Sequence, residues 1–202
     1  MAFGYAGAHR TGKTTLAKRV AEDLGMHFHD ASVSKIMREA GIDAVGDVPM
    51  EQRIEAQEFL LRRFLQDLNK APRPLISDRT PLDMIGYCLG EVTMHNTTPE
   101  LGKRIDAYVK SCLEATKNYF DTIVILGPLP HYDVAPDKPP PNAAYQRLVQ
   151  FLVEGAACQV NPAIYCEWLY NSDFEERRDI SNQIFCERIT HIAQQSKLVR
   201  KH

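Results

Sequence analysis

The feature that most constrains this chain is the segment Gly-Ala-His-Arg-Thr-Gly-Lys-Thr at residues 7–14, which matches the pattern G-x-x-x-x-G-K-[ST]. An apolar, strand-like segment precedes it at residues 2–6, and an amphipathic helical pattern follows it at residues 14–24. A loop of this kind between a strand and a helix offers backbone N–H groups and a helix N-terminus to an anion. The sequence therefore predicts a binding site for the phosphates of a nucleoside triphosphate.

The fixed positions of this segment have separate expected roles. Gly7 and Gly12 permit positive φ angles and a close approach of the backbone to phosphate. Lys13 is expected to reach the β and γ oxygens, and the Thr14 hydroxyl to ligate a Mg²⁺ ion that bridges them. The other residues assigned to this site are Ala8, His9, Arg10, Thr11 and Thr15. His9 and Arg10 fill the loop by default, Thr15 is expected to pack the helix, and the predicted cofactors are ATP and Mg²⁺.

Length and charge limit the remaining choices. A chain of 202 residues suits one α/β domain, which we expect to span residues 1–202. The formal net charge of -2 gives no global electrostatic reason to bind nucleic acid, because a polyanion binder usually carries a basic face. The expected partner is a small nucleotide or nucleoside, and a homo-oligomer is possible.

The number of cysteines and the hydropathy of the chain indicate the cellular compartment of the protein. The five cysteines are Cys88, Cys112, Cys158, Cys166 and Cys186. Their odd number and the lack of any C-x-x-C pair predict buried thiols in a reducing compartment rather than disulfides or a zinc site. No basic and apolar leader precedes the first strand, and no stretch approaches about 18 uninterrupted apolar residues. We expect a cytoplasmic protein without a membrane segment.

Strand-like and helical patterns alternate along the rest of the chain. Strands are expected at 26–29, 74–77, 121–126 and 163–167. Helices are expected at 32–40, 50–69, 82–91, 99–118, 143–154 and 173–194. This alternation predicts an α/β fold of three layers, a P-loop NTPase fold with a five-stranded parallel sheet flanked by helices, whose ligands bind beyond the carboxyl ends of the strands. Ser172 or Asp173 is expected to cap the last helix, and Trp168 and Phe174 to join the core.

Residues 127–142 contain six prolines and follow the strand predicted at 121–126. A segment of this length and composition predicts a functional loop, here a lid over the nucleotide. It contains no arginine, and Lys138 is its one cation, while Arg147 on the next helix is the nearest guanidinium. We expect Lys138 or Arg147 to stabilise the transferring phosphoryl group.

The segment Leu-Ile-Ser-Asp-Arg-Thr-Pro-Leu-Asp at residues 75–83 places polar side chains at the end of another predicted strand. Asp78 is suited to accept a hydroxyl proton or to hold Mg²⁺ through water, and Arg79 to clamp a phosphate by paired donors. Asp83, one turn into the next helix, is close enough to assist them. The alternative is that Asp78 caps the helix that starts at Pro81 and pairs with Arg79, with Asp83 favoured only by the helix dipole.

The region 30–70 is the predicted acceptor-binding part of the chain. Its candidate residues are Asp30, Ser32, Arg38, Arg53 and Gln57. Gln57 has the paired donor and acceptor that suit a base edge, and Arg38 or Arg53 suits an acceptor phosphate. Because arginine and glutamine are ordinary surface residues, solvated helices are the alternative. His27 and His29 share one strand face and are interpreted as packing or surface residues rather than metal ligands.

Taken together, these motifs resemble the P-loop nucleoside and nucleotide kinases, particularly the small AAA-labelled phage-type kinases and the nicotinamide riboside kinase domain. The match lies in residues 7–14, in residues 30–32, in the Arg53-x-x-x-Gln57 helix, in the D-R-[ST]-P-x-D pattern of residues 78–83 and in a lid after the fourth strand. The resemblance implies a catalytic or magnesium-linked role for Asp78. Family lids usually carry arginines, and this chain departs from that pattern.

The first functional hypothesis is an ATP- and Mg²⁺-dependent phosphotransferase acting on a small nucleotide, most simply a (deoxy)nucleoside monophosphate. A nucleoside or nicotinamide riboside kinase is the second, and it would need no clamp for an acceptor phosphate. An NTP-hydrolysing switch protein is the third, prompted by the arginine-poor lid. A nucleic-acid end kinase is the fourth, for which the pairs Arg62-Arg63 and Arg177-Arg178 supply only local positive charge.

Overall fold

The sheet is the element that brings the predicted site residues together. The computed structural model describes residues 1–31, 33–39, 41, 48–92, 96–130 and 142–199. Its strands are β1 (Ala2–Ala6), β2 (His27–His29), β3 (Leu75–Ser77), β4 (Thr122–Leu126) and β5 (Tyr165–Leu169). They form one five-stranded sheet in the order β2-β3-β1-β4-β5, and every pairing is parallel. The predicted α/β class and five-stranded parallel sheet are confirmed.

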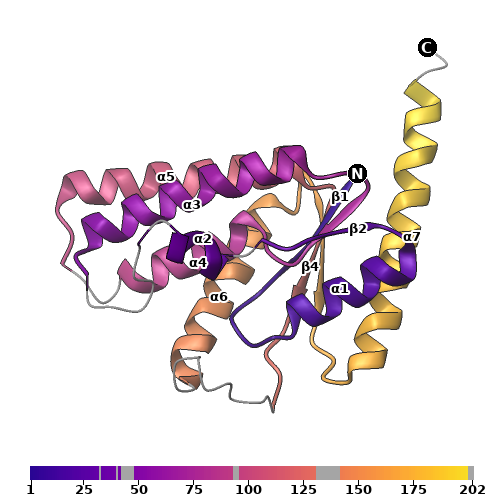
Figure 1. Cartoon of the computed structure of the whole chain (residues 1–202), viewed down its shortest axis with the longest axis horizontal. Helices are drawn as coiled ribbons and strands as arrows, with labels where there is room; N and C mark the ends of the chain where they lie inside the picture. Colours follow the sequence, from indigo (N-terminus) through magenta and orange to yellow (C-terminus); the bar gives the residue numbers. More distant parts are fainter. Residues whose placement is uncertain (32, 40, 42–47, 93–95, 131–141, 200–202) are drawn as a thin grey trace.

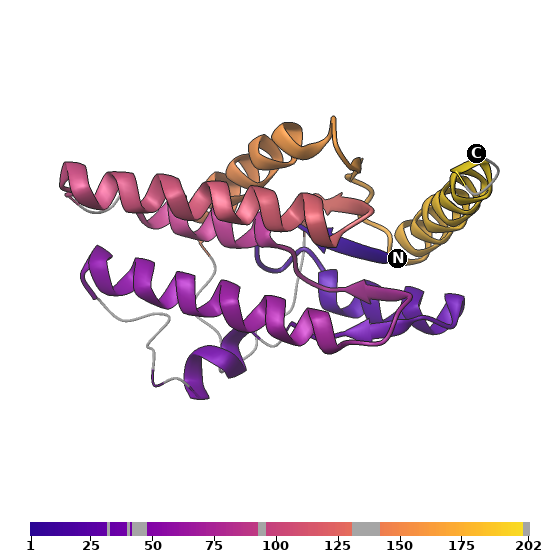
Figure 2. The same cartoon turned by 90° about the horizontal axis from the view of Figure 1, so that it is seen from above.

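Helices cover both faces of this sheet (Figure 1). They are α1 (Lys13–Leu24), α2 (Val33–Glu39), α3 (Met50–Lys70), α4 (Pro81–Val92), α5 (Pro99–Tyr119), α6 (Ala143–Val160) and α7 (Phe174–Val199). α1 and α7 lie on one side of the sheet, and α3, α4, α5 and α6 on the other. Figure 2 shows that α3, α4 and α5 run side by side and extend away from the sheet. Each strand and helix expected from the sequence is present.

The central strands are buried on both faces, which explains their continuous apolar character. All five residues of β1 are buried. Phe3 and Tyr5 pack with Phe185 of α7 on one face, while Ala2 and Ala6 belong to the larger core on the other. A parallel strand covered by helices on both faces needs apolar residues at every position rather than at alternate ones.

The main boundary error concerns the end of α6. The sequence predicted that this helix ends at residue 154, but it continues to Val160 because Ala156, Ala157 and Val160 stay buried at helical spacing beyond Gly155. β5 consequently runs over residues 165–169 instead of 163–167. α7 similarly extends beyond the predicted residue 194.

The sequence predicts a helix cap and two core side chains around the start of α7. Asp173 caps α7, because its side chain accepts a hydrogen bond from Glu176 N at 2.9 Å. Trp168 packs against the core as expected but is only partly buried. Phe174 is 38% exposed, so its assignment to the core was wrong. Its place at the first turn of α7 keeps it outside the packed face of that helix.

The cysteines follow the prediction only in part. Cys88, Cys112 and Cys166 are buried and free, but Cys158 and Cys186 are exposed. The last two lie on helix faces that do not contact the sheet, which periodicity alone did not reveal. Among the described residues, no helix combines the length and apolar character needed to cross a membrane.

Candidate active site

The loop between β1 and α1 adopts the conformation that its glycines permit. Gly7 has φ 142° and Gly12 has φ 83°, both in the region that disfavours other residues. A Cβ atom on Gly7 would lie 2.6 Å from the Leu126 carbonyl oxygen, so no larger residue fits there without a shift. α1 begins at Lys13, and its N-terminus therefore faces the concave side of this nucleotide loop (residues 7–14).

Lys13 is folded back onto the nucleotide loop. Its Nζ atom donates to the carbonyl oxygens of Gly7 at 2.8 Å and Ala8 at 2.6 Å, and it lies 3.6 Å from Asp83 Oδ1. The side chain is buried, and burial lowers the pKa of Lys13 to about 7, with the nearby Arg79 charge acting in the same direction. A bound polyphosphate would offer this ammonium group the anionic partner that favours its charged form.

Thr14 and Asp78 meet at the same edge of the sheet. Thr14 Oγ1 donates to Asp78 Oδ2 at 2.6 Å, and Asp78 Oδ1 accepts from Ala31 N at 3.1 Å. Asp78, which follows β3, therefore links the first turn of α1 to the segment that follows β2, and it does not cap α4. A hydroxyl and a carboxylate oxygen are hard ligands of the kind that Mg²⁺ binds, so this pair fits the predicted magnesium site.

Asp83 combines the two roles that the sequence left open. Its Oδ2 atom accepts from the backbone N of Thr80 at 2.9 Å and from the Thr80 hydroxyl at 3.1 Å, which closes the N-terminus of α4. Its Oδ1 atom lies 3.6 Å from Lys13 Nζ and 3.5 Å from a guanidinium nitrogen of Arg79. Asp83 thus caps a helix and also holds two cations beside the nucleotide loop.

Two glutamines of α6 hold the backbone of the nucleotide loop, and sequence reasoning missed both. Gln146 Nε2 donates to the His9 carbonyl oxygen at 2.7 Å, and Gln150 Oε1 accepts from Ala8 N at 2.9 Å. Both glutamines are buried, at 6% and 3% exposure. The available signal was their position, since they occupy the same helix face as the buried Val149 and Val153. A polar residue on an apolar face requires a partner.

A cluster of aromatic and charged side chains lies next to the nucleotide loop. The ring centroid of His9 is 6.0 Å from that of Tyr145, with the planes 29° apart, and 6.4 Å from that of Tyr87. Tyr145 donates to Glu91 at 3.2 Å, and Glu91 also lies 3.8 Å from Arg53 Nε. We call these five residues the His9 cluster, and it joins the loop to α3, α4 and α6.

His9 is uncharged in this cluster at neutral pH. Burial lowers the pKa of His9 to about 4, and the positive charges of Arg10, Lys13 and Arg79 act in the same direction. Burial also raises the pKa of Tyr87, which keeps its hydroxyl protonated. The His9 cluster therefore offers neutral rings and hydroxyl groups, with Glu91 and Arg53 as its charged pair.

The other predicted site residues are less closely grouped. Gln57 accepts a hydrogen bond from the Tyr108 hydroxyl at 3.2 Å and so contributes to the packing of α3 on α5. Arg38 on α2 and Arg147 on α6 are exposed, and Asp30 is exposed at the end of β2. Thr15 is exposed rather than packed. Ser32, Lys138 and residues 131–141 of the predicted lid lie outside the described residues.

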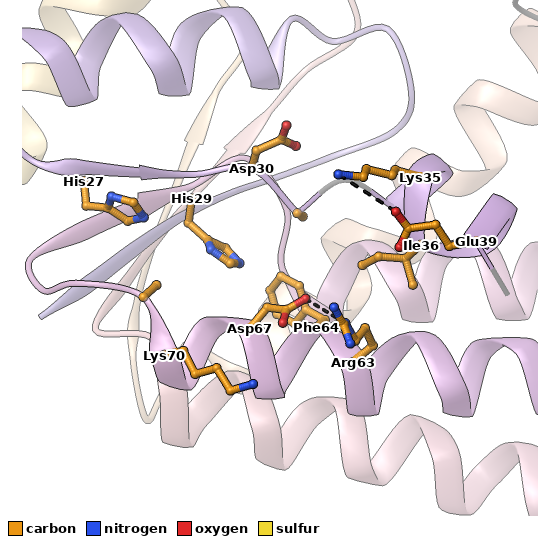
Figure 3. Close-up of a pocket in the computed structure, with 12 residues that line it drawn as sticks. His27, His29, Asp30, Lys35, Ile36, Glu39, Arg63, Phe64, Asp67 and Lys70 are labelled. Atoms are coloured by element: carbon orange, nitrogen blue, oxygen red, sulfur yellow. Dashed lines mark hydrogen bonds and ion pairs between the residues drawn. The ribbon is translucent and has the colours of Figure 1, made fainter.

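A cavity of about 340 Å³ lies beside β2, α2 and the second half of α3 (Figure 3). Its lining residues include Asp30 and the ion pairs Lys35–Glu39 and Arg63–Asp67. The ring of His29 also lines it and lies 5.7 Å from that of Phe64.

The cavity and the His9 cluster are separate features. Arg53 belongs to the first half of α3 and does not line this cavity. Burial lowers the pKa of His29, which keeps the ring neutral. Among the described residues, no group of three or more His, Cys, Asp and Glu side chains is arranged to hold a metal ion.

Comparison with solved structures supports the fold described above. Deoxyadenosine kinase from M. mycoides with bound dCTP superposes with a TM-score of 0.64 at 15% identity, covering 92% of this chain and 100% of that chain. The same enzyme with the products dCMP and a flexible dCDP gives 0.62 at 13% identity, covering 95% of this chain and 100% of that chain. At these identities the similarity shows a shared fold.

Comparison of sequences identifies the family. No curated protein sequence matches this chain at a significant level. A family model described as an AAA domain matches residues 5–160, which include the nucleotide loop, Asp78 and both glutamines of α6. The match extends over more than half of the chain, and the protein is therefore a member of this AAA domain family.

Proposed function

We propose that the protein is an ATP- and Mg²⁺-dependent kinase that phosphorylates a nucleoside. The observation that carries the proposal is the meeting of Lys13, Thr14 and Asp78 at one edge of the sheet, with 2.6 Å between Thr14 Oγ1 and Asp78 Oδ2. This arrangement supplies a phosphate loop, a lysine side chain beside it and two oxygen ligands for a divalent ion. Phosphoryl transfer depends mainly on such positioning and charge stabilisation.

The donor side follows from the nucleotide loop. The loop amides and the N-terminus of α1 would hold the β-phosphate, and Lys13 would leave the Gly7 and Ala8 carbonyls to bind the β and γ oxygens. Thr14 and, through water, Asp78 would hold Mg²⁺, which supplies charge neutralisation across the phosphates when bound. Asp83 stays beside Lys13, and its negative charge offsets part of the positive charge of the site.

The acceptor side favours a nucleoside over a monophosphate. Arg53 lies 3.8 Å from Glu91, and Arg79 lies 3.5 Å from Asp83, so both of these candidate guanidinium groups for an acceptor phosphate are already matched with carboxylates. An acceptor phosphate would have to displace these carboxylates, whereas a neutral sugar and base would not. The shared fold with deoxyadenosine kinase makes deoxynucleosides the first acceptors to test.

The chemistry also needs a group that takes the proton of the acceptor hydroxyl. Both carboxylate oxygens of Asp78 already accept hydrogen bonds, one from the Thr14 hydroxyl and one from Ala31 N. Asp30 is exposed one residue before Ala31, at the carboxyl end of β2. We assign the role of general base to Asp30, with Asp78 in the magnesium site.

The test is an assay of ADP release with ATP and Mg²⁺ against ribonucleosides, deoxynucleosides, their monophosphates and nicotinamide riboside, with product masses measured. A phosphorylated nucleoside is the expected product. Phosphorylation of monophosphates alone would contradict the nucleoside proposal and support the second candidate, a nucleoside monophosphate kinase. ADP release without any acceptor would support an NTP-hydrolysing switch instead.

A further inference from the structure

Arg177 is a buried arginine that contacts three backbone segments at the carboxyl edge of the sheet. Its side chain is on α7, and the residue is 2% exposed. One terminal nitrogen donates to the Thr11 carbonyl oxygen at 2.7 Å and the other to the Gly127 carbonyl oxygen at 2.9 Å, while Nε donates to the Asn171 carbonyl oxygen. These carbonyls belong to the nucleotide loop, to the residue after β4 and to the β5–α7 connection.

The charge of this guanidinium group is not neutralised by an acid in the described part of the chain. Its contacts are carbonyl oxygens, and no carboxylate among the described residues forms an ion pair with it. Burial lowers the pKa of Arg177, but an arginine side chain stays protonated at neutral pH. A buried charge without a counter-charge is costly, and a nearby anionic ligand would reduce that cost.

The position of the guanidinium group relates it to the phosphates. A Cβ atom built on Gly12 would lie 4.0 Å from its Nη1 atom, so the group lies directly beside the second glycine of the nucleotide loop. Its hydrogen bond turns the Thr11 carbonyl oxygen toward α7. Because Arg177 holds the Thr11 carbonyl, the N–H groups that follow it at the N-terminus of α1 can face an anion.

We propose that Arg177 is a positioning residue of the nucleotide site, which fixes the loop through the Thr11 carbonyl and adds a buried positive charge that favours a triphosphate. The inference rests on the donor half of the proposed function and not on the identity of the acceptor. It separates Arg177 from its neighbour Arg178, whose guanidinium group pairs with Asp23 and with Glu175. From the sequence alone, the two arginines are indistinguishable members of one basic pair.

The test compares Arg177→Met and Arg177→Lys with the matched control Arg178→Met. Calorimetric titration gives the affinities for MgATP, ADP, AMP and adenosine, and thermal unfolding without ligand reports folding. Arg177→Met is expected to bind MgATP about tenfold or more weakly, because the charged hydrogen bond to the Thr11 carbonyl is lost. The loss is expected to grow with the number of phosphates, which a purely structural role would not produce.

Arg177→Lys keeps the charge but cannot reach all three carbonyls, so its MgATP affinity is expected to fall between that of the parent protein and Arg177→Met. Arg178→Met is expected to bind MgATP like the parent protein. If Arg177→Met folds and binds MgATP like the parent protein, the proposal is wrong. An equal loss of affinity for adenosine and for MgATP would contradict the proposed contribution of the Arg177 charge.

A variant that fails to fold and a protein that is not a kinase give different results in these experiments. If Arg177→Met does not fold, Arg177→Lys decides, and unchanged MgATP affinity in that variant overturns the proposal. A parent protein that binds MgATP but phosphorylates no acceptor would refute the proposed kinase function. The binding comparison at Arg177 would still be valid in that case.

Discussion

Thr14 and Asp78 are 64 positions apart in the chain, and a 2.6 Å hydrogen bond joins the hydroxyl of one to the carboxylate of the other. The bond connects the first turn of α1 to the carboxyl end of β3. It places a hydroxyl ligand and a carboxylate at the entrance of the nucleotide loop, where a magnesium ion would bridge the phosphates.

Replacement of Asp78 by asparagine should reduce the chemical step. The amide keeps the shape of the carboxylate but loses the charge that would help to hold Mg²⁺, and we expect kcat to fall by about 100-fold or more. Steady-state kinetics at several Mg²⁺ concentrations measures this. Asp121→Asn is the matched control, because Asp121 also accepts a backbone hydrogen bond, from Ala2 N at 2.8 Å, at the opposite end of the sheet. An Asp78→Asn variant that loses only ATP affinity would assign Asp78 to binding alone.

Binding of MgATP at pH 8 should be accompanied by proton uptake at Lys13. The pKa of Lys13 is lowered from 10.5 to about 7 in the free protein, so most of its side chains are neutral at pH 8. The triphosphate favours the charged form and raises this pKa, so affinity should weaken as pH rises above about 7. Calorimetry in buffers with different ionisation enthalpies measures the uptake. Its absence in the parent protein, or its persistence in Lys13→Met, would contradict the assignment.

The same lowered pKa has a consequence for stability without ligand. Between pH 7 and 10.5 the unfolded chain binds more protons at Lys13 than the folded protein does. The contribution of Lys13 to the free energy of unfolding should therefore rise with pH across this range and be smallest below pH 7. Denaturant unfolding of the parent protein and Lys13→Met at pH 6.5 and 9 compares the two slopes. A parent stability that falls with pH relative to Lys13→Met would show the opposite sign.

Replacement of Gln150 by leucine should weaken both the fold and ATP binding. Gln150 accepts the hydrogen bond of Ala8 N, and leucine would leave that buried N–H without an acceptor, at a cost of about 1–3 kcal/mol in the free energy of unfolding. The Michaelis constant for ATP should rise because the start of the nucleotide loop is released. Gln159→Leu on the exposed side of the same helix is the control. Equal effects of the two substitutions would show that the loop contact is unimportant.

Replacement of Arg53 by alanine should distinguish a nucleoside from a monophosphate acceptor. Arg53 lies 3.8 Å from Glu91, and a partly exposed pair of this kind contributes about 1 kcal/mol or less. For a nucleoside acceptor we expect kcat/KM to change by about fivefold at most. Arg104→Ala, which removes an ion pair with Glu58 elsewhere on α3 and α5, is the control. A much larger loss confined to Arg53→Ala would indicate that an acceptor phosphate binds there.

The order of the strands and helices could be predicted because its causes are local. Apolar residues recur at strand or helix spacing within each segment, and the glycines of the nucleotide loop act through the backbone of a few neighbouring residues. The end of α6 was missed because Gly155 resembles a helix stop. Only the sheet and the helices packed on it decide that Val160 still needs burial.

The surroundings of the nucleotide loop depend on contacts between distant parts of the chain, which tertiary packing alone decides. Gln150 meets Ala8 across 142 positions, and Arg177 meets Thr11 across 166. Nothing in the neighbouring residues distinguishes Arg177 from Arg178, because the two differ only in the helix face that α7 turns toward the sheet. Short-range patterns of residues are enough to specify the phosphate loop and the order of strands and helices. The side chains that hold that loop are selected by packing, because burial forces each of them to find a distant partner.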